Sequence, residues 1–413
     1  MVSPLLRLSG KEIIKIMSDV QNFLDIDLWF CSFSGANAKT HCSHPTRTFD
    51  RHIGLLFDKM FENLPGVLPD IKFLANHLDE PRVLTPPRLM QGGDSSGKRQ
   101  FRVTDLSRRP TWNAITRYCA SQQSNESTQT KPTLETFSLP FVTDRSSDID
   151  LCQHPEYSNM HGLLISPTSF SLIEGLVPIL STGSPSTMGD LLFPSPAYIE
   201  SEFRYDETHD IEWDKKQNNL YWAGSNTGGF SVDEQWRSYH RQRFVTLAQN
   251  LGKQQQYYLR EKDGIISPSK SSFLNGRLYN VAFTRILQCT PTPCHSQTSY
   301  FHLKPWASKD RALSSKLVFD LDGNGISGRY YKLLASHSAP LKQTLFREWH
   351  DERLVPWVHY IPVSQSLEEV PELTSTLEPL KEGRARRYKN RLNLNNFPTI
   401  YASFIYSRNN STD

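Results

Sequence analysis

Residues 316–363 constrain the fold more than any other part of the chain. They contain, in order, an apolar run (317–319), an acidic glycine-rich turn (320–325), the triplet Ser327-Gly328-Arg329, a helical pattern (330–338) and a second apolar segment (358–363). This order of strand, turn, helix and strand is the unit of an open parallel sheet, in which the helix N-terminus faces the carboxyl ends of the strands. Free N–H groups at such an N-terminus bind phosphate, and Arg329 adds a guanidinium fork suited to a diphosphate.

The acidic turn also resembles two metal-binding patterns. Asp320, Asp322, Asn324 and Gly325 match a calcium loop, but Tyr331 stands where the loop needs a bidentate Glu. The apolar run before the turn also looks like a buried strand, whereas a calcium hand needs an amphipathic helix there. Asp320-x-Asp322 has the form of the metal-binding DxD of one class of nucleotide-sugar transferases, a pattern short enough to arise by chance. We expect a turn in which Asp side chains accept bonds from backbone N–H groups, and no metal site.

The length of the chain and its net charge limit the number of domains and the kinds of partner that we expect. A chain of 413 residues has room for two domains of ordinary size. Its 46 basic and 43 acidic residues give a net charge of +3, and no continuous basic stripe exists, so we expect no nucleic-acid partner. No run of 18 apolar residues is present, so we expect no membrane-spanning helix.

Six cysteines are present. Cys31 and Cys42, and likewise Cys289 and Cys294, are close enough in sequence to form local disulfides. No CxxC pair exists, which disfavours a zinc site. Cysteines spaced for disulfides favour a location in an oxidising compartment.

The first 200 residues offer candidate acid–base groups. Residues 11–30 have the pattern of an amphipathic helix, followed by a polar loop bounded by Cys31 and Cys42. Residues 71–74 suit a strand, which breaks before Asp79-Glu80-Pro81. Carboxylates just beyond a strand's carboxyl end occupy the place where open sheets keep their active sites. Asp79 or Glu80 is therefore a candidate general base, and a turn-forming Asp before Pro81 is the alternative.

A second glycine- and serine-containing turn follows a charged segment, 201–216, where we place a domain boundary. Residues 219–223 suit a strand that runs into Gly224-Ser225-Asn226. The helical stretch 234–251 then carries Arg237, His240, Arg241 and Arg243. One such turn is a weak phosphate signal, but two of them in the same half, each followed by an arginine-bearing helix, make a stronger one.

Eight segments together resemble the fungal capsule-associated glycosyltransferases of family ninety, which includes protein O-glucosyltransferases and their KDEL-motif relatives. The segments are AKTHCSHPTRTFDR (38–51), FLANHLDEPRVL (73–84), HGLLISP (161–167), GDLLFPSP (189–196), LYWAGSNTGG (220–229), WRSYHRQRFV (236–245), DLDGNGISGRYYKLLASHSAPLKQT (320–344) and EWHDERLVPWVHYIPVS (348–364). They follow one another in the family's order. Each segment alone is unspecific, whereas the combination is specific.

The resemblance implies a GT-B fold, in which two Rossmann-like domains face each other across a cleft. Residues 1–200 would form the acceptor domain, with polar insertions at about 92–131, and residues 201–375 the nucleotide-sugar domain. Residues 376–413, basic and Asn-rich, match nothing in the family. The implied reaction is inverting transfer of xylose or glucose from a UDP-sugar to a hydroxyl of a glycan or glycoprotein, without a metal or other cofactor. The implied location is the Golgi or ER lumen, with membrane association only through a segment outside this chain.

The resemblance also assigns residues. Asp79 matches the family's general base, in its Asn-x-x-Asp-x-Pro segment. The donor would lie on two groups of residues: Gly224, Ser225 and Asn226, and Ser327, Gly328 and Arg329. Relatives often have Arg where this chain has Asn226, so Arg243 or Arg241 would substitute. Further residues expected in the cleft are Glu80, Arg82, Trp357 and His359, although a Trp buried in a strand is an equally good interpretation of Trp357.

Two other functions remain open from the sequence. One is a protein of this fold that binds carbohydrate or nucleotide but has lost catalysis. The other is a calcium-binding module, which Tyr331 disfavours.

Overall fold

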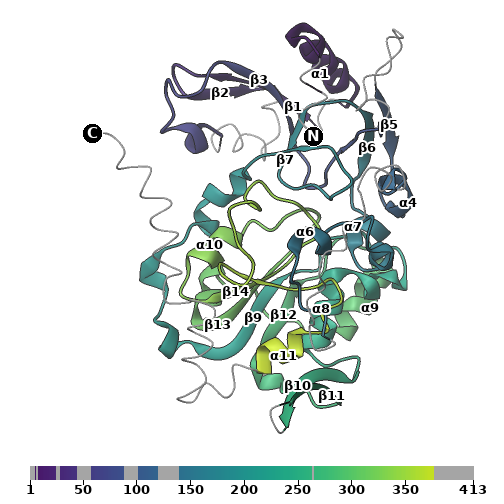
Figure 1. The fold of residues 1–413 in the computed structure, drawn as a ribbon, viewed down its shortest axis with the longest axis vertical. Coiled ribbons are helices and arrows are strands. Elements are labelled where there is room, and N and C mark those ends of the chain that lie inside the picture. Colours follow the sequence, from purple (N-terminus) through teal and green to yellow (C-terminus); the bar gives the residue numbers. More distant parts are fainter. Residues whose placement is uncertain are drawn as a thin grey trace.

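The computed structural model describes residues 5, 8–24, 28–43, 57–87, 101–119, 139–262 and 265–375. These residues form a mixed α/β protein with helices and several β-sheets (Figure 1). The sheets formed by residues before 200 lie at the top of Figure 1, and a parallel sheet formed by later residues lies below them.

A five-stranded parallel sheet dominates the second half of the chain. Its strand order is β12-β9-β13-β14-β15, and every neighbouring pair is parallel. The strands are β9 (Gln217–Ser225), β12 (Tyr279–Arg285), β13 (Ser315–Leu321), β14 (Ala339–Gln343) and β15 (Ile361–Pro362). The parallel sheet predicted from residues 316–363 is therefore confirmed.

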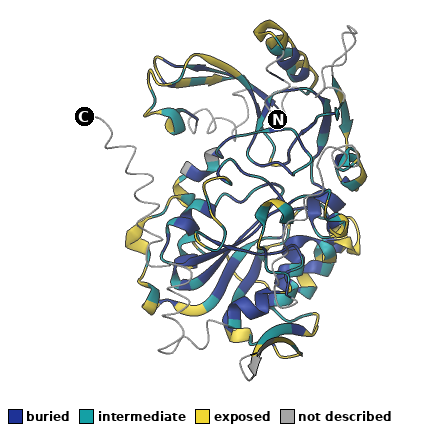
Figure 2. Cartoon of the chain, in the orientation of Figure 1, coloured by how far each residue is buried: buried dark blue, intermediate teal, exposed yellow. Residues whose placement is uncertain are grey.

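Helices cover both faces of this sheet, which is why β13 is apolar on both sides. Phe319 of β13 packs against Phe244 of α8 (His240–Ala248), with ring centroids 4.5 Å apart. Val318 points to the other face and packs with Leu333 of α10 (Tyr330–Ala335). The central strands are consequently buried, as their dark colour in Figure 2 shows.

The segment after α10 differs from the prediction. The helix ends at Ala335 rather than at residue 338, and β14 follows almost at once. The sequence Ala-Pro-Leu-Lys-Gln of β14 does not read as a buried strand, because proline lacks an N–H group and Lys342 is charged. The fold accommodates Lys342 by pairing its Nζ with Asp320 Oδ2 at 2.8 Å and Glu348 Oε1 at 2.7 Å. The strand predicted within 358–363 is present as β15.

Two other sheets precede the parallel one. A mixed sheet has the order β2-β1-β3-β7-β8, and a three-stranded sheet has the order β4-β6-β5. Their strands are β1 (Leu28–Ser34), β2 (Lys39–Cys42), β3 (Ile71–Asn76), β4 (Val83–Leu84), β5 (Phe101–Asp105), β6 (Ser171–Gly175), β7 (Ile179–Ser181) and β8 (Leu191–Leu192). Strand β5 lies inside the expected polar insertion, whose other residues, apart from 106–119, lie outside the described residues, as does the tail 376–413.

The N-terminal prediction was partly wrong. Helix α1 (Gly10–Leu24) ends before residue 30, and strand β1 begins at Leu28. The apolar residues up to Phe30 fit a helical spacing, but those from Leu28 onward belong to a strand that alternates between buried and half-buried positions. The expected polar loop is instead a hairpin in which Cys31 of β1 faces Cys42 of β2.

The remaining α-helices have between four and ten residues. One hairpin forms a separate two-stranded sheet. The helices are α4 (Trp112–Ile115), α6 (Arg145–Asp148), α7 (Gly162–Ile165), α9 (Pro291–Tyr300) and α11 (Val370–Ser375). The predicted helical stretch 234–251 is divided by Tyr239 into a 3-10 helix, η8 (Glu234–Ser238), and α8. Strands β10 (Gln256–Lys262) and β11 (Ile265–Ser271) form an antiparallel hairpin at the bottom of Figure 1.

All six cysteines form disulfides. Cys31–Cys42 and Cys289–Cys294 confirm the two local pairs, and Cys119–Cys152 joins residues 33 positions apart. Structural disulfides persist in oxidising compartments, so they indicate a secreted or luminal setting. In the described part of the chain, no helix has both the length and the apolar character to cross a membrane.

Candidate functional site

Two arginines converge where β9 and β13 end. The guanidinium carbons of Arg241 and Arg329 lie 5.6 and 5.8 Å from the centre of the Trp222 ring. Arg241 donates to the carbonyl oxygens of Asp322 at 2.6 Å and Ser225 at 3.0 Å. Arg329, the residue before α10, donates through Nη1 to the carbonyl oxygen of Ala223 at 2.8 Å. We call Arg241 and Arg329 the arginine pair.

The arginine pair lacks a carboxylate partner. Within the described residues, no carboxylate lies within 4.0 Å of either guanidinium, and their hydrogen bonds go to uncharged oxygens. Burial and then the charge of Arg329 lower the pKa of Arg241 to about 9. Burial also lowers the pKa of Arg329, against the opposite effects of Asp320, Tyr221 and Glu202. Carboxylates such as Asp320 act on both arginines from a greater distance, but none in the described part of the chain is in ion-pair contact, so a bound anion would stabilise the two cations.

A third cation acts on the same site. Lys309 Nζ lies 5.3 Å from the centre of the Phe203 ring, and Phe203 in turn packs against Gly328. Burial lowers the pKa of Lys309, and the charges of Arg329 and Arg241 lower it further. Lys309 therefore adds to the positive potential of the arginine pair.

Asp79 lies beside the turn that follows β13. Strand β3 ends at Asn76, and the chain then turns through Asp79 toward Pro81. A Cβ atom added to Gly325 would lie 2.8 Å from the Asp79 carbonyl carbon and 3.2 Å from its Cβ. The Asp79 side chain is exposed, yet desolvation by the protein around it raises the pKa of its carboxyl, while Arg241 and His77 lower it. The fold thus brings Asp79 and the arginine pair to one turn.

Glu80 and Arg82, both expected in a cleft, are buried and brace the Asp79 turn. Glu80 Oε1 accepts a bond from the Ser169 backbone N–H at 3.2 Å, and Arg82 Nε donates to Asn76 Oδ1 at 3.1 Å. Burial and the neighbouring charge of Asp79 raise the pKa of Glu80 to about 7. Asp79 is therefore the exposed carboxylate of this turn, and Glu80 is its buried neighbour.

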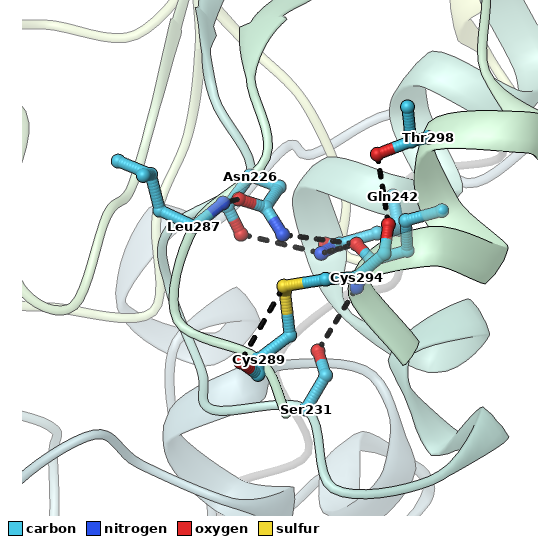
Figure 3. The surroundings of a disulfide bond; sticks show 8 residues. Asn226, Ser231, Gln242, Leu287, Cys289, Cys294 and Thr298 are labelled. Carbon is cyan, nitrogen blue, oxygen red and sulfur yellow. Dashed lines mark hydrogen bonds between the residues drawn. A yellow bond between two sulfur atoms is a disulfide. The ribbon is translucent and has the colours of Figure 1, made fainter. Parts of the chain in front are cut away.

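Among the predicted donor residues, Gly224 and Ser225 contact the arginine pair and Asn226 does not. A Cβ on Gly224 would lie 3.3 Å from Arg329 Nη2, and the Ser225 carbonyl accepts from Arg241. Asn226 is buried and points into the protein, where Nδ2 donates to Gln297 at 3.0 Å and Oδ1 accepts from Leu287 N–H at 2.5 Å (Figure 3). Asn226 thus stabilises the turn from behind.

Arg243 points away from the site. Its guanidinium donates to the carbonyl oxygens of Gln365 at 2.8 Å and Ser366 at 3.0 Å. Residues two apart on a helix face opposite sides, so only one of Arg241 and Arg243 can reach the turns. The structure places Arg241 there. The sequence nominates both and carries no signal to choose between them.

Of the other predicted residues, Ser327 and Gly328 lie next to the candidate site, whereas Trp357 and His359 form hydrogen bonds elsewhere. Ser327 is buried beside Asp320, and Gly328 packs against Phe203, so both position the residue before α10. Trp357 Nε1 donates to the Val142 carbonyl at 2.7 Å, and His359 Nδ1 accepts from Val355 N–H at 2.8 Å. These hydrogen bonds of Trp357 and His359 join neither residue to Asp79 or to the arginine pair.

The side chains that match the calcium-loop pattern form contacts with other protein groups. Asp320 pairs with Lys342, Asp322 Oδ2 accepts from Leu345 N–H at 2.8 Å, and Asn324 Oδ1 accepts from Gly228 N–H at 3.1 Å. The preceding element is strand β13 rather than a helix. The three side chains do not converge on one point. No group of three or more His, Cys, Asp and Glu residues suited to a metal ion occurs in the described ranges.

The chain matches no protein-family model, and no curated protein matches it. The resemblance to capsule-associated glycosyltransferases therefore stays a prediction from the eight segments quoted above. Of the residues that those segments nominate, Gly224 and Ser225 end β9, Gly328 and Arg329 lie between β13 and α10, and Asp79 packs against Gly325 of the same loop.

Replacing Asn226 by Ala is expected to lower the free energy of unfolding by about 1–3 kcal/mol, because Leu287 N–H and the Gln297 amide lose their buried partner. Asn280→Ala is the matched control, since its side-chain bond to Lys304 is exposed and its loss should cost no more than about 0.5 kcal/mol. Urea denaturation of both variants measures the difference. Equal stabilities would show that the Asn226 contacts do not hold the turn.

Proposed function

We propose that this protein is an inverting glycosyltransferase that moves xylose or glucose from a UDP-sugar to a hydroxyl of a glycan or glycoprotein. One observation supports this most directly: an exposed carboxylate, Asp79, and a pair of arginines without carboxylate partners in the described part of the chain meet at the carboxyl edge of a parallel sheet. Open α/β sheets bind ligands at that edge. The choice of uridine and of the sugar comes from the resemblance.

The arginine pair has the chemistry for the leaving group. Guanidinium groups bind phosphate through paired N–H donors. Among the described residues, the Arg329 guanidinium bonds only through Nη1, which leaves Nε and Nη2 for an anion. As the bond between the anomeric carbon and the phosphate oxygen breaks, the electron pair stays on UDP. Cations fixed beside that oxygen stabilise the charge without rearranging, which is the largest electrostatic task of the reaction.

Asp79 would act on the acceptor. Its carboxylate takes the proton of the acceptor hydroxyl while the hydroxyl oxygen attacks the anomeric carbon, from the face opposite UDP. The raised pKa of Asp79 makes it a stronger base than an ordinary carboxylate. The charge of Arg241 acts in the opposite direction and favours the ionised form of the carboxyl.

We further propose that residues 1–200 and 201–375 correspond to the acceptor and donor domains of a GT-B enzyme. The parallel sheet supports the second assignment, since the arginine pair lies on segments that follow its strands, Arg241 on α8 and Arg329 before α10. The three disulfides support action in an oxidising lumen, such as that of the ER or Golgi.

Calorimetric titration with UDP in the presence of EDTA tests the donor site. UDP is expected to bind with the same affinity with and without EDTA, because the arginine pair supplies the positive charge. Absence of UDP binding would contradict the proposal. Binding of calcium that raises the melting temperature, without UDP binding, would favour the calcium-binding alternative.

A further inference from the structure

The turn of residues 322–325 contacts the candidate base and the candidate phosphate site at once. On one side, the Asp322 carbonyl oxygen accepts from Arg241 Nε at 2.6 Å and from His240 Nε2 at 2.8 Å. On the other side, Gly325 packs against the backbone of Asp79. We call these four residues the spacer turn.

The spacer turn is held from several directions. Within it, Gly323 N–H donates to the Gly325 carbonyl at 2.8 Å. Asn324 Oδ1 accepts from Gly228 N–H at 3.1 Å and from Thr168 Oγ1 at 3.3 Å. The next residue after Thr168, Ser169, donates its N–H to Glu80 Oε1. Three short segments, 79–80, 168–169 and 324–325, therefore each contact the other two.

A buried histidine, His161, contacts Asp322 at the first position of the spacer turn. His161 Nε2 lies 3.4 Å from Asp322 Oδ2, while His161 Nδ1 accepts from Leu163 N–H at 3.1 Å. The His161 ring stacks on that of His240, with centroids 3.7 Å apart. Asp322 Oδ2 also accepts from Leu345 N–H. Contacts from Asp79, His161, Thr168, Gly228, the start of α8 and Leu345 thus hold the spacer turn in place.

We propose that the spacer turn sets the distance between Asp79 and the arginine pair, and that Gly325 is its positioning residue. This inference rests on the proposed function. Gly325 does not have a positive φ angle, so alanine is allowed there by the backbone, and the obstacle is the Asp79 backbone. A methyl group at 325 would clash with the carbonyl oxygen and carbon of Asp79, so the Asp79 backbone must shift relative to the arginine pair, whereas the Asp322 contact with Arg241 lies on the other side of the turn.

Gly325→Ala is therefore expected to lower kcat for UDP-sugar turnover by about 100-fold, the effect of a displacement of about 1 Å, with UDP affinity unchanged. Gly323→Ala is the complementary variant, because its Cβ would lie 3.2 Å from Arg241 Nη2, and it should weaken UDP binding. Gly276→Ala is the control, since a Cβ there meets nothing within 4 Å. It should change neither quantity.

Two outcomes overturn the inference: Gly325→Ala keeps its kcat, or it loses kcat, UDP affinity and melting temperature together, as a purely structural residue would. Absence of turnover in the wild-type protein would instead count against the proposed function. The inference is then decided by crystal structures of Gly325→Ala and Gly276→Ala. Movement of the Asp79 backbone away from Arg241 in the first variant supports it, and an unmoved Asp79 overturns it.

Discussion

Replacing Asp79 by Asn is expected to reduce UDP-sugar turnover by about 10²–10⁴-fold, the usual contribution of a general base. Asn has nearly the same shape as Asp but cannot take the acceptor proton. The Asp79 side chain is exposed, so the variant should fold and should keep its affinity for UDP. Initial rates of UDP release, together with calorimetry, measure both quantities.

Asp233→Asn is the control for that experiment, because Asp233 is exposed and caps η8 away from the site. The pH profile adds a second check. Since the pKa of Asp79 is raised, wild-type turnover should increase with pH through a range above that of an ordinary Asp carboxyl. Unchanged turnover in Asp79→Asn would remove this residue from the mechanism.

Replacing Arg329 by Lys is expected to weaken UDP binding by about tenfold or more. The variant keeps the positive charge but loses the guanidinium fork, and a hydrogen bond to a charged group contributes about 1.5–3 kcal/mol. Arg329 does not brace the acidic turn through an ion pair, because Asp320 pairs with Lys342 and Asp322 accepts from Leu345. Loss of affinity is therefore expected without unfolding.

Arg243→Lys is a matched control on the neighbouring helix α8. Arg243 donates to the carbonyls of Gln365 and Ser366, so its replacement should lower the melting temperature and leave UDP affinity unchanged. The reverse result, in which Arg329→Lys loses only stability and Arg243→Lys loses only affinity, would contradict the assignment of the arginine pair.

The sequence predicts the parallel sheet because its signals are local. The apolar run of β13, the glycine-rich turn and the start of α10 are contiguous, and each has a characteristic pattern. Strand β14 was missed because its stability depends on distant residues. Lys342 is acceptable in a buried strand because Asp320 and Glu348 lie beside it.

The candidate site was predictable only in part, for the same reason. Asp79 and Arg329 each follow a strand, and that position alone nominates them. That Arg241 rather than Arg243 joins Arg329 depends on how α8 is rotated against the sheet. The burial of Asn226 depends on Leu287 and Gln297, which lie more than 60 residues away.

The central claim is tested most directly by incubating the purified protein with UDP-xylose and UDP-glucose in EDTA, with simple glycans or water as acceptor, and following UDP release. Asp79→Asn is run in parallel. The account predicts metal-independent release from at least one donor by the wild-type protein and its loss in the variant. UDP binding without release from either donor would contradict catalysis and would favour an inactive nucleotide-binding protein of the same fold.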